Sequence, residues 1–366
     1  MTPAIVSDQR SELRSHLLRR GGLLAAFLFA TFMAMMGLGT DVDERLRLIR
    51  DNARSHQASG QIAIVEIDAR SLKPISDWPW PRRIHADLTD KLRAAGARTV
   101  VFDVDFSATT NPADDAAFAA ALQRSGGAIV LPTFRQPVSE GSTVFTENMP
   151  IAPLRAHAFL GSVNVQPDAD GQLRHYNYGT ITAGTPRPSL AAHLADSRGN
   201  IGKQFRIDTA LDPVTIPRTS AIDVLNGKAA HLRGKAVLIG ATAIEMGDRY
   251  VVPGHGVLPG VVVQALAGET LILGTVNPDA GPWPALILTA ILLTLGIRTR
   301  RFAAVATVTT MLLLVGPLAL EMMNIGSFQI APAFVLLVLD GLVVGILQLR
   351  RKLLEQVLLR FYPLPP

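Results

Sequence analysis

Four apolar runs are the feature of this 366-residue sequence that most restricts its fold. They occupy residues 21–39, 283–297, 302–320 and 330–349. Because a helix needs about 20 mostly apolar residues to cross a bilayer, the first, third and fourth runs are long enough to span it. The second run is slightly short, and we expect it to be extended to 282–297. The sequence therefore predicts an all-α membrane domain of four transmembrane helices.

The first run favours an uncleaved anchor over a cleaved signal peptide, because its apolar stretch is long and no A-x-A site follows it. Three clusters of basic residues flank the runs at ends that would lie on the same side of the membrane. The link 321–329, which would lie on the opposite side, contains no Lys or Arg. The basic residues are Arg10, Arg14, Arg19 and Arg20, then Arg298, Arg300 and Arg301, then Arg350, Arg351 and Lys352. By the positive-inside rule, the leader 1–20 and the tail 350–366 are cytoplasmic, and residues 40–281 lie in the periplasm or outside the cell.

The composition excludes several classes of function. The net charge of +5 comes largely from the membrane flanks, so it does not indicate nucleic-acid binding. The sequence contains no cysteine, which excludes disulfides, thiolate metal sites and cysteine nucleophiles. An exported domain of this length must then rely on an ordinary packed core.

The stretch from residue 61 to residue 107 carries the core of the exported domain. Residues 62–67 and 99–102 are short β-branched runs typical of buried strands, and residues 82–95 between them have helical apolar spacing. A strand, helix and strand of this length favour a parallel pair with a right-handed crossover. We therefore expect an α/β domain with a mixed, largely parallel sheet flanked by helices, and carboxylates at the carboxyl edge of the strands.

Further elements follow from local patterns. Residues 41–59 carry a helical stripe that we expect to continue the first span outward, and residues 132–153 resemble a loop. The Asp-Gly step at 170–171 predicts a hairpin whose arms are residues 159–165 and 173–180. Later segments predict a third strand, a buried strand and an apolar helix, at residues 128–131, 235–240 and 261–272.

Polar and aromatic residues near the expected sheet edge are the candidate ligand-binding groups. They are Asp68, Trp80, Arg82, Asp103, Asp105 and Asp248. Open α/β sheets bind ligands at this edge. The four carboxylates also suit a divalent cation. The structural alternative is that they cap helix N-termini, pair with Arg82 or Arg83, or fix loops at the sheet edge. Trp78 and Trp80 form either a ligand wall or a lid packed on the core. No histidine has metal-site spacing, and we expect no cofactor.

The membrane helices and the tail supply candidates for signal relay. They are Trp283, Asp340, Gly341, Gly345, Leu353 and Val357. Asp340 is costly to bury in lipid, so we expect it to face the bundle interior or another subunit. The spacing of Gly341 and Gly345 favours close helix packing. The tail 350–361 is expected to continue the last helix with near-heptad apolar spacing until the prolines at 363–366, as at the start of a coiled coil.

The motifs of the exported domain resemble the second class of CHASE domains, the sensory extracellular modules associated with cyclases and histidine kinases. The matching residues include Glu66-Ile67-Asp68, Trp80-Pro81-Arg82, Phe102-Asp103-Val104-Asp105-Phe106, Asp168-Ala169-Asp170-Gly171 with Arg174, and Leu238-Ile239-Gly240-Ala241-Thr242 with Asp248, Pro253, Pro259 and Gly260. The resemblance covers about residues 40–280, and it implies a bacterial inner-membrane receptor with a periplasmic sensor. The family's usual cyclase or kinase output has no counterpart in the residues 350–366 that follow the last span, so we expect the output to lie outside these 366 residues.

We therefore expect a non-enzymatic membrane receptor, with lipid as its surroundings and a small molecule or protein as its signal. A homo-oligomer, first of all a dimer, and a separate cytoplasmic cyclase or kinase are the expected partners. One alternative is a scaffold that holds a partner protein without switching. Another is a periplasmic phosphatase, because Asp103-Val104-Asp105 after a strand resembles the nucleophile motif of haloacid-dehalogenase-like phosphatases, with Ser107 and the Gly247-Asp248 pair as weaker matches.

Overall fold

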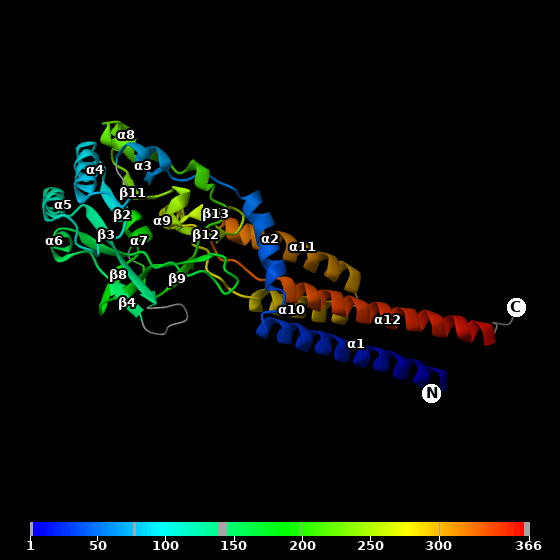
Figure 1. The fold of residues 1–366 in the computed structure, drawn as a ribbon. Coiled ribbons are helices and arrows are strands. Elements are labelled where there is room, and N and C mark those ends of the chain that lie inside the picture. The colour runs from blue at the N-terminus through cyan, green and yellow to red at the C-terminus, as the bar shows by residue number, and fades with distance from the viewer. Residues whose placement is uncertain (1–2, 76–77, 138–144, 198, 300, 362–366) are drawn as a thin grey trace. The chain divides into compact units, whose positions relative to one another are not determined.

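The computed structural model describes residues 3–75, 78–137, 145–197, 199–299 and 301–361 (Figure 1). The chain divides into two compact units. Unit 1 contains Met1–Arg50 and Asn277–Pro366 and is helical, whereas unit 2 contains Asp51–Val276 and has an α/β fold. The predicted helix break at residues 363–366 lies outside the described residues.

A seven-stranded sheet forms the centre of unit 2 within the described residues. Its strand order is β10-β1-β11-β2-β3-β4, with β5 also paired to β3. All pairs are parallel except β3–β4, so the predicted mixed, largely parallel sheet is confirmed. In sheet order, the strands are Arg218–Ser220, Ile62–Ile67, Ala236–Ala241, Thr99–Asp103, Ile129–Pro137, Phe145–Asn148 and, for β5, Phe159–Ser162.

The alternation of side chains along the strands divides the core into two layers. In β1, Val65 and Ile67 face one layer, whereas Ile62 and Ile64 face the other, because successive side chains in a strand point to opposite faces. The first layer is covered by α4 (Arg82–Ala94), α5 (Pro112–Arg124) and α8 (Ala221–Leu225). The second is covered by α7 (Leu190–Leu194) and α9 (Gly260–Leu273), as Figure 1 shows. The sheet is thus sandwiched between helices.

Three expectations about strand pairing were wrong. The strands β1 and β2 do not pair with each other, because β11 from much later in the chain lies between them and is parallel to both. The expected loop 132–153 instead continues β3 to Pro137 and contains β4. The hairpin around Gly171 does not form, although the turn does, because β5 pairs with β3 while β6 pairs with β9. Long-range pairing overrides the local turn signal.

Short elements complete unit 2. Two hairpins pair β7 with β8 and β12 with β13, and β6 pairs with β9. Their bounds are Gly179–Thr182, Thr185–Pro188, Arg249–Val252, Gly256–Pro259, His175–Asn177 and Gln204–Arg206. The helices α3 and α6 are Ala69–Ile75 and Ala152–Arg155, and three 3-10 turns lie at Pro213–Thr215, Ala230–Leu232 and Ile244–Met246.

Within its described residues, unit 1 consists of five long helices. They are α1 (Pro3–Met35), α2 (Thr40–Ala53, of which the last three residues belong to unit 2), α10 (Trp283–Thr299), α11 (Phe302–Met322) and α12 (Ala331–Phe361). The sequence had suggested that residues 41–59 continue the first span, but α2 does not continue α1. The chain breaks between them where Gly37 and Gly39 take φ values of +65° and +94°, a conformation that glycine adopts at little cost.

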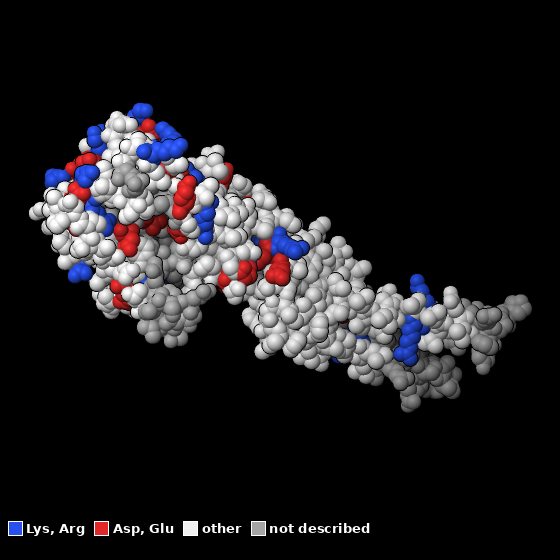
Figure 2. All heavy atoms as spheres, in the orientation of Figure 1, with Lys and Arg blue, Asp and Glu red and all other residues white. Residues whose placement is uncertain are grey.

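Three helical segments of the described chain are long and apolar enough to cross a membrane: Leu17–Met35, Phe302–Met322 and Ala331–Leu354. The remaining candidate, α10, has 17 residues. At 1.5 Å per residue it reaches about 26 Å, slightly short of a hydrocarbon core of about 30 Å. The four-span arrangement is therefore not confirmed. A broad band on the visible side of these helices carries no Lys, Arg, Asp or Glu, as contact with lipid requires (Figure 2).

Candidate functional site

A cavity of about 490 Å³ opens at the carboxyl edge of the sheet in unit 2. Asp103 and Asp105 enter its wall from the end of β2, and Arg135 enters from β3. The hairpin strand β12 supplies Tyr250, and α9 supplies Gln264. The remaining described lining residues are Trp78, Val104, Phe134, Val163, Asn164, Val165, Ala241 and Asp248. Its size suits a small organic ligand.

Asp103, at the end of β2, is a part-buried charged group of this wall. Burial, and next the negative charge of Asp248, raise the pKa of Asp103 from 3.8 to about 7. A hydrogen bond from Gln264 acts in the opposite direction and is outweighed. Near neutral pH the Asp103 carboxyl is therefore divided between its protonated and ionised forms, which makes it sensitive to any charge that enters the cavity.

Asp248 is held beside Asp103 by a close approach of backbone and side chain. A Cβ added at Gly260, the first residue of α9, would lie 1.8 Å from Asp248 Oδ2. The Gly260 N–H also donates to the Asp248 carbonyl at 3.0 Å, and the Tyr250 hydroxyl hydrogen-bonds the Asp248 side chain. The glycine is thus required for the position of the carboxylate, independently of any turn conformation.

Two buried polar atoms near this wall lack a hydrogen-bond partner within the described residues. They are Gln264 Oε1 and the Tyr176 hydroxyl, on side chains that are 2% and 1% exposed. Burial, and next the charge of Asp103, raise the pKa of Tyr176, so its hydroxyl stays protonated. An unsatisfied buried polar atom destabilises a fold by about 1–3 kcal/mol, and such atoms are found where a ligand completes the network.

The sequence-predicted ligand residues do not all meet at this cavity. Asp103, Asp105 and Asp248 line it. Asp68 lies elsewhere, where its Oδ1 accepts hydrogen bonds from the Ser71 and Ser220 hydroxyls at 2.6 and 2.8 Å. That network holds the turn after β1, so Asp68 follows the structural alternative. Among the described residues no group of three His, Asp or Glu side chains is arranged to hold a metal ion, and the four-carboxylate cation site does not form.

Trp80 and Arg82 are part of the core. Trp80 is 2% exposed, and the Arg82 guanidinium lies 4.4 Å from the centroid of the Phe106 ring while donating to the carbonyls of Asp105 and Ala108 at 3.2 Å each. These contacts fix the loop that follows β2. Trp78, the other member of the aromatic pair, lines the cavity and meets Trp80 edge-on at 5.7 Å.

His85 lies inside the same aromatic cluster. Complete burial, and next the positive charge of Arg82, lower its pKa to about 3, so it is neutral and packs as an aromatic ring against Phe102 and Phe106. The polar cavity residues that sequence reasoning missed are Gln264, Tyr250, Arg135 and Asn164. The interrupting glutamine in the apolar run 261–272 was the one visible signal.

A scan against known protein families matches residues 23–298 to the family described as the CHASE2 domain. The chain belongs to this family of sensory domains. The match covers most of the chain, including the cavity and the larger part of the apolar segment Leu17–Met35. A search of curated proteins and a search of solved structures each returned no match. The family assignment, together with the three apolar helices, supports a membrane protein with a sensory domain.

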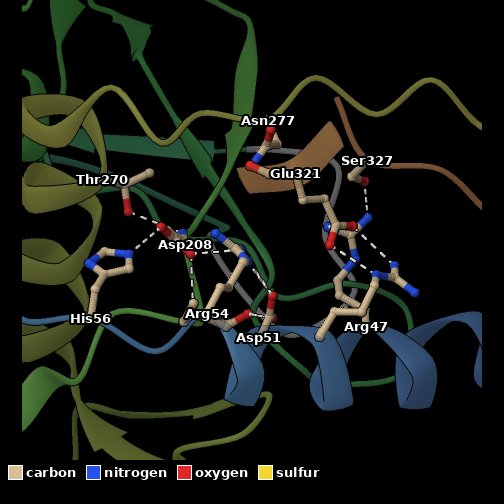
Figure 3. Close-up of polar contacts among 12 residues, drawn as sticks. Arg47, Asp51, Arg54, His56, Asp208, Thr270, Asn277, Glu321 and Ser327 are labelled. Atoms are coloured by element: carbon tan, nitrogen blue, oxygen red, sulfur yellow. Dashed lines mark hydrogen bonds and ion pairs between the residues drawn. The ribbon is translucent and has the colours of Figure 1, made fainter. Parts of the chain in front are cut away.

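In unit 2, a polar network joins the end of α2 and the segment after it to Asp208 and α9 (Figure 3). Asp208, 3% exposed, pairs with Arg54 at 2.8 Å and with His56 Nε2 at 2.9 Å, and its backbone N–H donates to Thr270 on α9 at 3.1 Å. Arg54 also pairs with Asp51 at 2.9 Å. Burial alone would raise the pKa of Asp208, but Arg54 and His56 hold it below its ordinary value.

In unit 1, a second network joins α2 to the end of α11 (Figure 3). Arg50 donates two hydrogen bonds of 2.9 and 3.0 Å to the Glu321 carboxylate, and both residues are buried. Arg47 approaches the same carboxylate at 3.8 Å and bonds the Ser327 hydroxyl. Asp43 accepts the N–H groups of Ile330 and Ala331, which cap α12. The sequence analysis missed both networks, although Glu321 at the end of an apolar run was a visible signal.

The predicted relay residues have different surroundings. Asp340 is fully buried within unit 1, as expected, and Arg19 on α1 is the charged group that faces it. No described residue packs where a Cβ at Gly341 or Gly345 would point, so the close packing expected there is not found among the described residues. Gly22 of α1 makes the close approach instead, against Val343. Trp283, Leu353 and Val357 are 44–52% exposed; the relay roles stay predictions.

Proposed function

We propose that this chain is the input part of a bacterial inner-membrane receptor, in which the CHASE2 domain binds a small molecule in the cavity at the carboxyl edge of the sheet. The observation that carries the proposal is the cavity's wall. It combines a ligand-sized volume with the buried, unpartnered Gln264 Oε1 and with Asp103, whose ionisation responds to added charge. A scaffold that holds a protein partner has no need of such a ligand-sized polar site.

The signal would pass to the membrane helices through the segments that join them to the domain. Gln264 of the cavity and Thr270, which contacts Asp208, both lie on α9. The Asp208 network holds Asp51 and Arg54, at the end of α2, and the earlier residues of α2 bind Glu321 and cap α12. A ligand can shift this arrangement only by binding one conformation more tightly than another.

The topology we propose has four spans, with α10 as the short one. Residues 40–281 would then be periplasmic, and both termini would be cytoplasmic, in agreement with the three basic flanks. The tail 350–361 would contact a separate cyclase or kinase, or the same tail of a second copy. Its exposed Leu353 and Val357 support such a contact. No catalytic role is proposed for the chain itself.

The test perturbs the cavity and measures the tail. Because the chain has no cysteine, Val357→Cys gives a single site for disulfide cross-linking between copies in native membranes. We expect Asp103→Asn to change the extent or rate of cross-linking, because it removes the charge that a ligand would alter. Asp90→Asn is the matched control, since Asp90 is an exposed carboxylate on α4 outside the cavity.

Identical cross-linking in the Val357→Cys chain, in its Asp103→Asn variant and in its Asp90→Asn variant would contradict a switching receptor and favour a scaffold. A pull-down of the tagged chain from native membranes then identifies the output. A cytoplasmic cyclase or kinase in fixed proportion supports the receptor, whereas an exported protein as the sole companion supports the scaffold.

A further inference from the structure

The wall of the CHASE2 cavity is rich in hydrogen-bond acceptors. Asp103, Asp105 and Asp248 present carboxylates, and Gln264 presents an amide oxygen. Among the described lining residues the one cationic group is Arg135, which is exposed and has its guanidinium 4.4 Å from the centroid of the Phe145 ring. The wall therefore has an excess of negative charge, and it favours a ligand that carries positive charge and donates hydrogen bonds.

Gln264 indicates which polar group the ligand carries. Its side chain hydrogen-bonds Asp103, and since Oε1 has no partner, the amide nitrogen is the donor in that contact. The Gln264 residue is 2% exposed, and its amide oxygen needs a hydrogen-bond donor that no described group supplies. An ammonium group has three N–H donors and no acceptor. It would satisfy Gln264 Oε1 and neutralise Asp103 and Asp248 at the same time.

The other free acceptors are fewer than the list of lining residues suggests. Asn164 is already satisfied, because its Oδ1 accepts from the Arg135 N–H at 3.0 Å and its amide nitrogen donates to the Arg135 carbonyl at 2.7 Å. Asp105 accepts the N–H and hydroxyl of Ser107 at 2.8 and 3.0 Å. The unfilled capacity is thus concentrated at Asp103, Asp248 and Gln264.

Aromatic side chains line the same space. Trp78, Phe134 and Tyr250 contribute to the wall, and aromatic faces attract cations as well as the methylene groups that carry an amine. This combination of carboxylates, a buried carbonyl oxygen and aromatic rings does not suit an anion or a phosphate ester.

We propose that the cavity binds a small organic compound with a protonated primary amine, whose ammonium group lies between Asp103, Asp248 and Gln264 Oε1. The inference rests on the proposed sensory function and specifies its ligand class. Two sources share this chemistry: a simple diamine, and an amino acid whose carboxylate would pair with Arg135 at the rim. Their common element is the ammonium.

Amine binding should depend on pH. The ionised form of Asp103 binds the ammonium, and its pKa of about 7 in the free protein means that affinity falls as the pH decreases through 7. The titratable and charged groups that face Asp103 are Asp248, Tyr176 and Tyr250, with Asp105 and Arg135 on the same wall. Both tyrosine hydroxyls stay protonated, because burial raises the pKa of each. Binding below pH 7 should therefore release protons.

Calorimetric titration of the full chain in lipid nanodiscs tests the proposal. The probes are 1,4-diaminobutane, lysine and, as the neutral isostere of the diamine, 1,4-butanediol. We expect at least one amine to bind and the diol not to bind, with about tenfold or greater loss of affinity in Asp103→Asn and Gln264→Leu. Asp90→Asn is the matched control and should bind as the unaltered chain does. If a cavity variant fails to fold, the test uses the amine affinity of the unaltered chain between pH 6 and pH 8, which should fall as the pH decreases.

Diamine binding without lysine binding identifies the simple amine as the source, and the reverse result identifies the amino acid. Binding of the diol as tight as that of the diamine, a pH-independent affinity, or no binding of either amine overturns the inference. Its failure differs from failure of the proposed function. If a neutral or anionic compound binds and alters Val357→Cys cross-linking, the receptor proposal holds without the amine. If an amine binds but cross-linking stays the same, the ligand class holds without the signalling role.

Discussion

Replacing Asp103 with asparagine should stabilise the CHASE2 domain in a pH-dependent way. The unfolded chain has the ordinary carboxyl pKa of 3.8, whereas burial, followed by the charge of Asp248, raises the pKa in the folded domain to about 7. Between these values the folded state binds more protons than the unfolded state, so stability falls as the pH rises and levels off above 7. Asparagine has nearly the same shape as the protonated acid and does not ionise.

The size of the effect follows from that window. From pH 5 to the folded pKa, about two pH units at about 1.4 kcal/mol each give about 3 kcal/mol of lost stability in the unaltered protein. For a domain the size of unit 2, this corresponds to a difference in Tm of about 6–12 °C. In the absence of ligand, we therefore expect the Tm difference, variant minus unaltered protein, to be about 6–12 °C larger at pH 8 than at pH 5.

Intrinsic tryptophan fluorescence on heating measures this transition, since two of the three tryptophans, Trp78 and Trp80, lie in unit 2. The difference between the two proteins at each pH cancels the titration of all other groups. Asp105→Asn is the matched control, because it removes an exposed carboxylate from the same turn. A constant Tm difference from pH 5 to pH 8 would refute the reasoning that Asp103 is forced to ionise in a buried position.

Other predictions concern packing and topology. Gly260→Ala should displace the nearby Asp248 carboxylate, lower stability by about 1–3 kcal/mol on thermal unfolding and abolish amine binding. Arg50→Met should destabilise unit 1 by about 3–5 kcal/mol, because it leaves the buried Glu321 carboxylate without its bidentate partner. Loss of helical circular dichroism measures this effect. As a control, Arg83→Met at an exposed ion pair should change stability by less than about 1 kcal/mol. In cells, a membrane-impermeant maleimide should label Ile325→Cys from outside and Arg298→Cys only after permeabilisation; the reverse pattern would mean that α10 does not cross. A Mg²⁺-supplemented phosphomonoester assay should give no turnover, and measured turnover would restore the phosphatase alternative.

The elements of the core were predictable because their signals are local. The short β-branched run of β1, the helical spacing of α4 and the apolar length of α11 and α12 each reflect a period or a length that a short stretch of sequence contains in full. The carboxylates at the strand ends followed from the same reasoning, since parallel strands end at one edge. The motif resemblance to the sensory family was confirmed by the match to residues 23–298.

The partners of these elements depended on the tertiary structure. Nothing local to β1 or β2 indicates that β11 lies between them, and the turn at Gly171 gives no sign that its flanks pair with β3 and β9 instead. Pairing is decided by the total burial of both sheet faces, which sums over residues far apart in sequence.

The site shows the same division. The sequence determined that Asp103 and Asp105 would stand at the end of a buried strand, but they are equivalent in the pattern. Only the tertiary structure distinguishes them, because Asp103 lies part-buried beside Asp248 and Gln264, whereas Asp105 is exposed on its own turn. Desolvation and charge proximity are properties of the surrounding volume. The sequence therefore determined which groups reach the edge of the sheet, and the packing of α9 and β12 decided which of them face a ligand.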